Sequence, residues 1–161
     1  MDSDQILRQH LVTLLKGRGA HMSVQDAVAD IPDECINARP PNVSYTFWHL
    51  VEHIRIAQWD ILEYVRNPAY VSPKWPEGYW PHPDAQTDRA GWDDSIRRFN
   101  EDLNAMEAIV LDPATDLLAP IPHGYDGHTI LREVLLVADH NAYHTGELGI
   151  LRQVMNTWTG K

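Results

Sequence analysis

Apolar residues recur along this chain at steps of three and four, the spacing of amphipathic helices, and no segment shows the alternation of a strand. The clearest stripe lies between residues 87 and 111, at Trp92, Ile96, Phe99, Leu103, Met106 and Val110. Such a seam predicts a long helix with one face packed into the core of a bundle.

The same periodicity and the signals at helix ends predict three further long helices, over residues 4–16, 44–66 and 129–156. Ser23 is expected to cap a short helix that ends by residue 30. Four long helices and a short one indicate an all-α four-helix bundle, and a chain of 161 residues is expected to form a single domain over residues 1–161.

The segment between residues 70 and 83 is expected to be an ordered loop rather than a helix. Its second part, from residue 72, contains four prolines and the aromatic residues Trp75, Tyr79 and Trp80. Proline interrupts helices, whereas aromatic side chains are scarce in disordered segments. The loop is therefore predicted to lie against the body of the protein.

Charge and cysteine content narrow the classes of partner and location. The formal net charge is -10, so a phosphate backbone or an anionic membrane would repel the chain, and neither partner is expected. Cys35 is the single cysteine, which excludes an internal disulfide. The acidic first residues do not form a signal peptide and no apolar run spans a bilayer, so a cytoplasmic location is expected.

Two pairs of histidines at four-residue spacing are the strongest candidate for chemistry: His49 with His53, and His140 with His144. Residues four apart share one face of a helix, so two imidazoles can bind one metal ion. Helical geometry places both pairs within apolar stripes. Burial of several imidazoles is costly unless each finds a partner, and a divalent metal would satisfy them together.

Three of these histidines, His53, His140 and His144, are favoured as metal ligands. Three protein ligands leave room for water or a substrate atom, as in catalytic sites, whereas four would close a tetrahedral shell. His49 stays a weaker candidate for a fourth ligand. The spacing does not identify the metal, since imidazole suits zinc, nickel, copper and iron.

Three acidic residues, Glu147, Asp60 and Glu133, share the core stripes with the histidines. Each could accept the second N–H of an imidazole or act as a general base on activated water, and Glu147 and Asp60 are the preferred catalytic candidates. A salt bridge near the end of the bundle is an equally good interpretation for each acid.

The two histidine segments resemble those of the DinB-like superfamily. The resemblance rests on Leu50-Val51-Glu52-His53-Ile54 and on the closing motif His140-x-x-x-His144-x-Gly146-Glu147. It implies a four-helix bundle in up-up-down-down order, often a homodimer. It also implies a divalent metal, such as nickel, zinc or iron, held by one histidine of the second long helix and two of the last, here His53, His140 and His144.

Two positions beside this motif depart from the family pattern. Thr145 stands where many relatives have arginine, and Glu147 stands where they often have glutamine. These departures concern how a substrate is handled rather than the three histidines.

The resemblance further implies a thiol S-transferase that uses a low-molecular-weight thiol such as bacillithiol or mycothiol. The metal would lower the pKa of the thiol, and the thiolate would attack a small electrophile, in a pocket expected to include Trp75, Tyr79 and Trp80. Two alternatives stay open. One is a metal-dependent hydrolase with Glu147 or Asp60 as base, and the other is a non-enzymatic, metal-stabilised protein with a binding or stress-response role.

Overall fold

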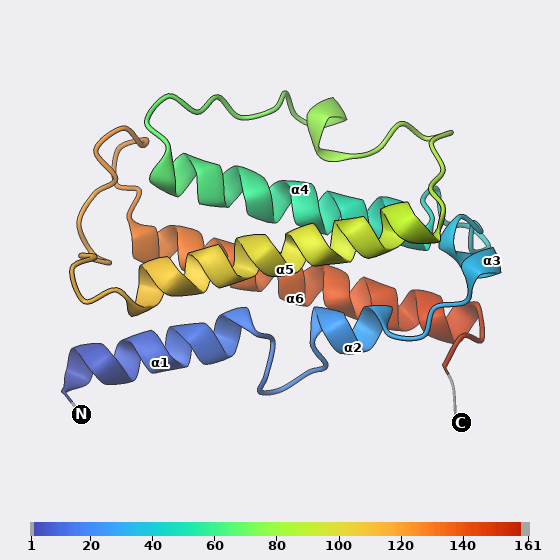
Figure 1. Cartoon of the computed structure of the whole chain (residues 1–161), viewed down its shortest axis with the longest axis horizontal. Helices are drawn as coiled ribbons and strands as arrows, with labels where there is room; N and C mark the ends of the chain where they lie inside the picture. Colours follow the sequence, from blue (N-terminus) through green and yellow to red (C-terminus); the bar gives the residue numbers. More distant parts are fainter. Residues whose placement is uncertain (1, 159–161) are drawn as a thin grey trace.

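The computed structural model describes residues 2–158, and within them the long elements are four helices (Figure 1). They are α1 (Ser3–Leu15), α4 (Phe47–Arg66), α5 (Arg89–Leu111) and α6 (Ile130–Val154). Shorter elements are α2 (Val24–Val28), α3 (Asp33–Ile36) and the 3-10 turn η1 (Glu77–Tyr79). The described residues contain no strand beyond an isolated bridge between Pro120 and Thr129. The predicted all-α bundle is confirmed.

Side-chain caps place the beginnings of α4 and α5 a little later than the periodicity predicts. The Thr46 hydroxyl accepts from the His49 amide at 3.1 Å, so α4 begins at Phe47 rather than at residue 44. Asp88 caps α5 in the same way, and Thr129 caps α6 as predicted. The short helix α3 is not predicted: Pro32 is expected only to end the preceding helix, whereas in the structure it is the N-cap residue of α3.

The order of helix directions differs from the up-up-down-down order that the family resemblance implies. In Figure 1, α1 and α6 run from left to right, whereas α4 and α5 run from right to left. In chain order the directions are therefore up, down, down and up. Gln58 of α4 bonds to the Phe99 carbonyl of the parallel α5, and to Asn141 of the antiparallel α6. The reason is the connector of residues 67–88, which returns along the whole of α4 before α5 begins.

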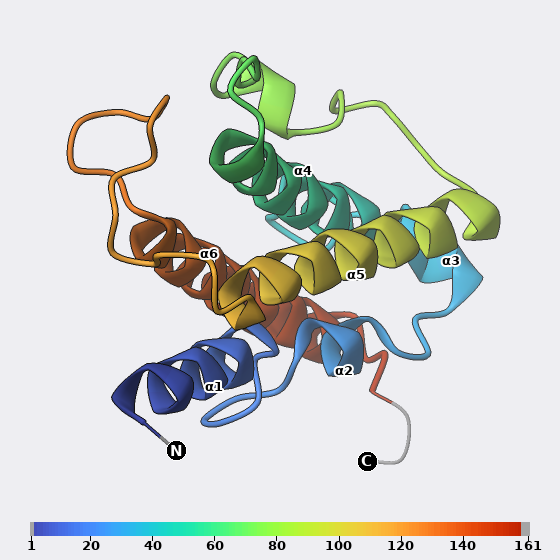
Figure 2. The same cartoon turned by 60° about the vertical axis from the view of Figure 1, so that its left-hand side comes forward.

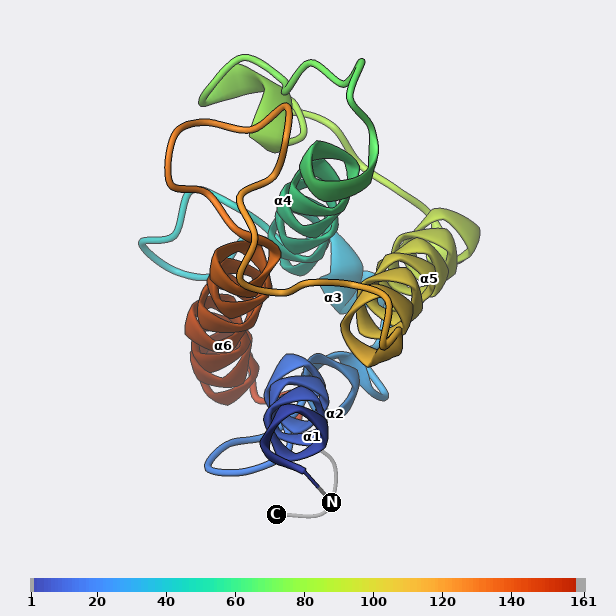
Figure 3. The ribbon, with the colours of Figure 1, turned by 90° about the vertical axis from the view of Figure 1, so that its left-hand side faces the viewer.

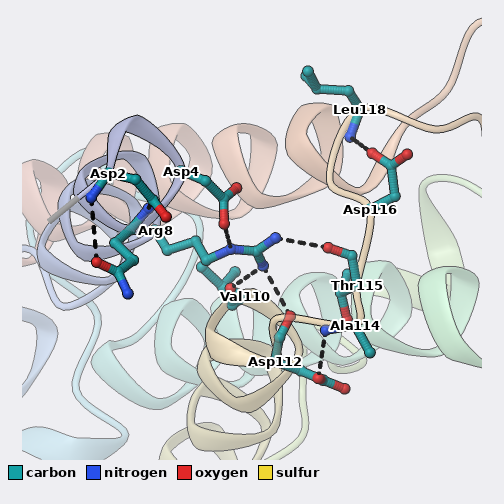
Figure 4. A network of polar contacts seen from close by, with 10 residues as sticks. Asp2, Asp4, Arg8, Val110, Asp112, Ala114, Thr115, Asp116 and Leu118 are labelled. Carbon is teal, nitrogen blue, oxygen red and sulfur yellow. Dashed lines mark hydrogen bonds and ion pairs between the residues drawn. The ribbon is translucent and has the colours of Figure 1, made fainter.

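Viewed along its axis, the bundle has α4, α5 and α6 at three corners, and α1 with α2 at the fourth (Figure 3). Two buried arginines secure this fourth corner. Arg152 of α6, only 2% exposed, donates to the carbonyls of Ala27 and Ala29 at the end of α2. Arg8 of α1 donates to three carbonyls at and beyond the end of α5 (Figure 4). Charge-assisted bonds to carbonyls that end a helix stabilise this arrangement.

The connector lies over α4, on the side of the bundle away from α1 and α2 (Figure 2). Apart from η1 it is irregular, as its prolines predict. His49 of α4 donates from Nε2 to the Ala85 carbonyl at 2.9 Å, which fixes the later part of the connector. Within residues 2–158 no helix combines the length and apolarity needed to cross a bilayer.

Candidate metal centre

Three imidazoles from two helices meet in the bundle. His53 Nε2 of α4 lies 3.2 Å from Nε2 of His144 and 3.2 Å from Nε2 of His140, both on α6. One nitrogen from each ring lies within 4.8 Å of the others, and His53 and His144 are buried. Within residues 2–158 no other group of three or more His, Cys, Asp or Glu side chains gathers in this way.

Hydrogen bonds on the far side of two rings determine which nitrogens face one another. His53 Nδ1 lies 2.8 Å from the Tyr79 carbonyl, and since a carbonyl only accepts, the proton is on Nδ1. His144 Nδ1 lies 2.5 Å from Glu147 Oε2, which gives the same assignment beside an ionised carboxylate. The Nε2 atoms of His53 and His144 therefore face each other with lone pairs, and only a shared cation resolves that contact.

The neutral form is favoured in two of the three rings. Burial, and then the two neighbouring imidazoles, lower the pKa of His140 to about 4. Burial also lowers the pKa of His53. Both rings are thus neutral near pH 7, which is the form that ligates metals. The donor set suits divalent ions that accept imidazole, among them zinc, nickel and iron.

Aromatic residues cover one side of the cluster. Trp80 lies parallel to the His53 ring, with 3.8 Å between centroids and 5° between planes, and Tyr45 packs on Trp80 at 5.5 Å. Tyr143 contacts His144 at 4.9 Å and is 66% exposed. The sequence predicts Trp80 in the wall of the site but neither Tyr45 nor Tyr143. An aromatic residue just before a helix or on its outer face has no sequence pattern that distinguishes it.

The other two aromatic residues expected in this wall lie differently. Tyr79 reaches His53 through its backbone carbonyl, while its hydroxyl is turned to Asp60. Trp75 packs on Tyr79 at 5.3 Å and is 66% exposed.

The three candidate carboxylates have three different environments. Glu147 accepts from His144 and, at 3.3 Å, from the Tyr45 hydroxyl. Asp60 accepts from two tyrosine hydroxyls of the connector. Glu133 pairs with Arg132 at 2.6 Å near the start of α6, away from the cluster. Of the three, only Glu147 contacts a ring of the histidine cluster directly.

His49 lies outside the cluster although it is four residues before His53. Its Nδ1 accepts from the Thr46 amide at 3.4 Å, and its Nε2 donates to the Ala85 carbonyl. Both nitrogens are therefore engaged in capping α4 and in fixing the connector.

Comparison with known proteins gives one match. A family model described as the DinB superfamily matches residues 18–148, a segment that contains His53, His140 and His144. No match was found among curated proteins, and none among solved structures.

Proposed function

Since the chain belongs to the DinB superfamily, we propose that it is a divalent-metal enzyme, and specifically a thiol S-transferase that joins a low-molecular-weight thiol to a small electrophile. The observation that carries the metal site is the set of three facing Nε2 atoms, two of which, in His53 and His144, belong to rings fixed by a hydrogen bond at Nδ1. Three protein ligands leave a position open for a further ligand.

Each residue of the site has a proposed role. His53, His140 and His144 would hold the metal through Nε2, and Glu147 keeps His144 in the tautomer that ligates. When bound there, a divalent metal would lower the pKa of a thiol or water ligand. In the proposed transfer a C–S bond forms as the bond to the leaving group breaks. Glu147, whose side chain is 30% exposed, would accept the thiol proton.

The surroundings of the cluster favour an apolar or aromatic electrophile. Trp80 stacks on His53, Tyr45 packs on Trp80, and Tyr143 contacts His144. Planar apolar groups bind well against such rings.

Hydrolysis is a second candidate, supported by the exposed edge of Glu147. Its Oε1 has only the long bond to Tyr45, so this oxygen is available to orient a water molecule. Asp60 is less suited to act as a base, because both of its oxygens already accept hydrogen bonds.

A turnover assay separates these functions. Untagged protein loaded with zinc, nickel or iron(II) would be given monochlorobimane with bacillithiol, mycothiol or glutathione. We expect product only with both metal and thiol, loss of product in His144→Ala, and unchanged turnover in His128→Ala, whose ring lies outside the cluster. Activity on ester substrates without thiol would favour the hydrolase. Metal binding without any turnover would favour the non-enzymatic role.

We also propose a homodimer formed through the outer face of α6. This face exposes apolar side chains at Leu136, Tyr143, Ile150 and Val154. Exposed apolar stripes on a helix commonly mark association surfaces. Light scattering over a range of concentrations would test the dimer, and a constant monomer mass would contradict it.

A further inference from the structure

Asp60 holds the connector to α4. It lies on α4 two turns after His53, and its Oδ1 and Oδ2 accept from the hydroxyls of Tyr70 at 2.9 Å and Tyr79 at 2.7 Å. Both tyrosines belong to the connector. Hydrogen bonds to an ionised carboxylate are stronger than neutral ones, so this is a firm attachment for a segment with little regular structure.

Tyr79 links this attachment to a ligand of the cluster. Its hydroxyl bonds to Asp60, while its backbone carbonyl accepts from His53 Nδ1 at 2.8 Å. The next residue, Trp80, stacks on the face of the same imidazole. The His53 ring is thus held at one edge and on one face by two consecutive residues, whose position along α4 depends on Asp60.

We propose that Asp60 is a positioning residue for the metal centre, acting through Tyr79 and Trp80 to keep the His53 ring oriented with Nε2 toward His140 and His144. This inference rests on the metal-binding part of the proposed function. Asp60 touches none of the reacting groups, and its two oxygens are occupied by the tyrosines.

The carboxylate at this position of α4 fixes the backbone of the connector. A backbone carbonyl orients a ligand histidine only if the backbone itself is fixed. His49 fixes the connector at Ala85, and Asp60 fixes it at Tyr70 and Tyr79, on either side of the contact with His53. Without Asp60, the Tyr79 carbonyl and the Trp80 ring would no longer be held in place against the His53 ring.

The test compares Asp60→Ala, Asp60→Asn and Tyr79→Phe with Tyr64→Phe. Tyr64 is the matched control, because it also lies on α4 and its hydroxyl bonds to His128 Nδ1, with no link to His53. Two quantities would be measured: the zinc dissociation constant by competition with a chromogenic chelator, and the His53 tautomer from ¹⁵N shifts of the metal-free protein. Circular dichroism would verify that each variant is folded.

We expect Asp60→Ala to weaken zinc binding by about 10-fold, the usual scale for an outer partner of a ligand histidine. Tyr79→Phe and Asp60→Asn should show a smaller loss, and Tyr64→Phe none. In the metal-free Asp60→Ala and Tyr79→Phe variants, His53 should no longer be confined to the Nδ1–H form. Wild-type zinc affinity and an unchanged tautomer in both variants would overturn the proposal. If the wild-type protein binds no metal, the proposed function fails, whereas the tautomer measurement still decides the role of Asp60.

Discussion

Two groups of histidines contact α4, and they differ in what their nitrogens face. In the candidate metal centre, Nε2 of His53 faces Nε2 of His140 and His144. In the second group, near the end of α4, His123 Nε2 donates to the Tyr64 carbonyl, and His128 Nδ1 lies 3.0 Å from the Tyr64 hydroxyl.

The difference shows that a concentration of histidines does not by itself mark a metal site. In the second group each of these nitrogens faces an oxygen of the protein, and Glu133 lies 3.3 Å from His128, so the protein itself provides partners. In the metal centre Nε2 of His53 and Nε2 of His144 face each other as two acceptors, with no donor between them. The second group is therefore complete without a ligand, whereas the facing nitrogens of the metal centre require a cation.

The largest expected effect comes from removing a ligand of the metal centre. His140→Ala or His144→Ala should weaken zinc binding by more than about 100-fold, since partners outside the ligand shell already account for ~10–100-fold. His128→Ala should leave zinc affinity unchanged, because its ring lies in the oxygen-facing group. Competition titration with a chelator measures both. Equal losses in His128→Ala and His140→Ala would remove the distinction between the groups.

Removal of the metal should lower stability next most strongly. At a free zinc concentration 100 times Kd, binding to the folded state adds about 2.7 kcal/mol to the free energy of unfolding. Thermal melting with zinc and with excess chelator would show this as a fall in Tm. His128→Ala should melt lower than the wild type yet keep the same zinc-dependent rise. The absence of such a rise in the wild type would contradict a site that binds only in the folded state.

Loss of the carboxylate behind His144 should have a smaller effect. Glu147→Ala removes the acceptor of the His144 Nδ1 proton, and zinc affinity should fall by about 10-fold. Glu133→Ala is the matched control, since it removes a carboxylate from the other group and should change stability but not zinc affinity. The same titration checks both variants. An effect of Glu133→Ala on zinc binding as large as that of Glu147→Ala would argue against the assigned roles.

The smallest expected effect is the pH dependence of the metal-free protein. The pKa of His140 is about 4 in the folded state and near its ordinary value of 6.5 when unfolded. Between these values the unfolded chain binds a proton that the folded protein does not. The stability that the neutral His140 ring gives to the folded state is therefore fully present above about pH 6.5, and it is lost as pH falls toward 4. His53, whose pKa is also lowered, acts in the same direction.

Urea midpoints at about pH 7 and about pH 5 would measure this dependence. The fall in stability should be smaller in His140→Ala than in the wild-type protein, because the variant lacks one of the groups that titrates differently in the two states. Equal falls in both proteins would show that His140 titrates normally.

Local patterns predicted much of this structure because they depend on neighbouring residues. The helix stripes, the Thr129 cap and the histidines that share one face of α6 follow from spacing alone. The α5 seam is also confirmed, with Ile96 the only partly buried member. The family model and the helical structure confirm the resemblance that the two histidine motifs suggest.

Contacts made by the connector were not predictable in the same way. Tyr79 orients His53 through a backbone carbonyl, which carries no residue signature. His49 has the spacing of a ligand, yet the Thr46 cap and the Ala85 carbonyl take both its nitrogens. The direction of α5 depends on the path of residues 67–88, and spacing does not determine that path. The cytoplasmic location and the lack of a nucleic-acid partner stay predictions.

The metal content of untagged protein, measured by mass spectrometry after purification and after reconstitution, decides whether the three histidines bind a metal. We expect close to one divalent metal per chain in the wild type and in His128→Ala, and little in His140→Ala and His144→Ala. A wild-type protein that neither carries nor takes up a divalent metal would contradict the account, and would leave the facing nitrogens to be satisfied by protons alone.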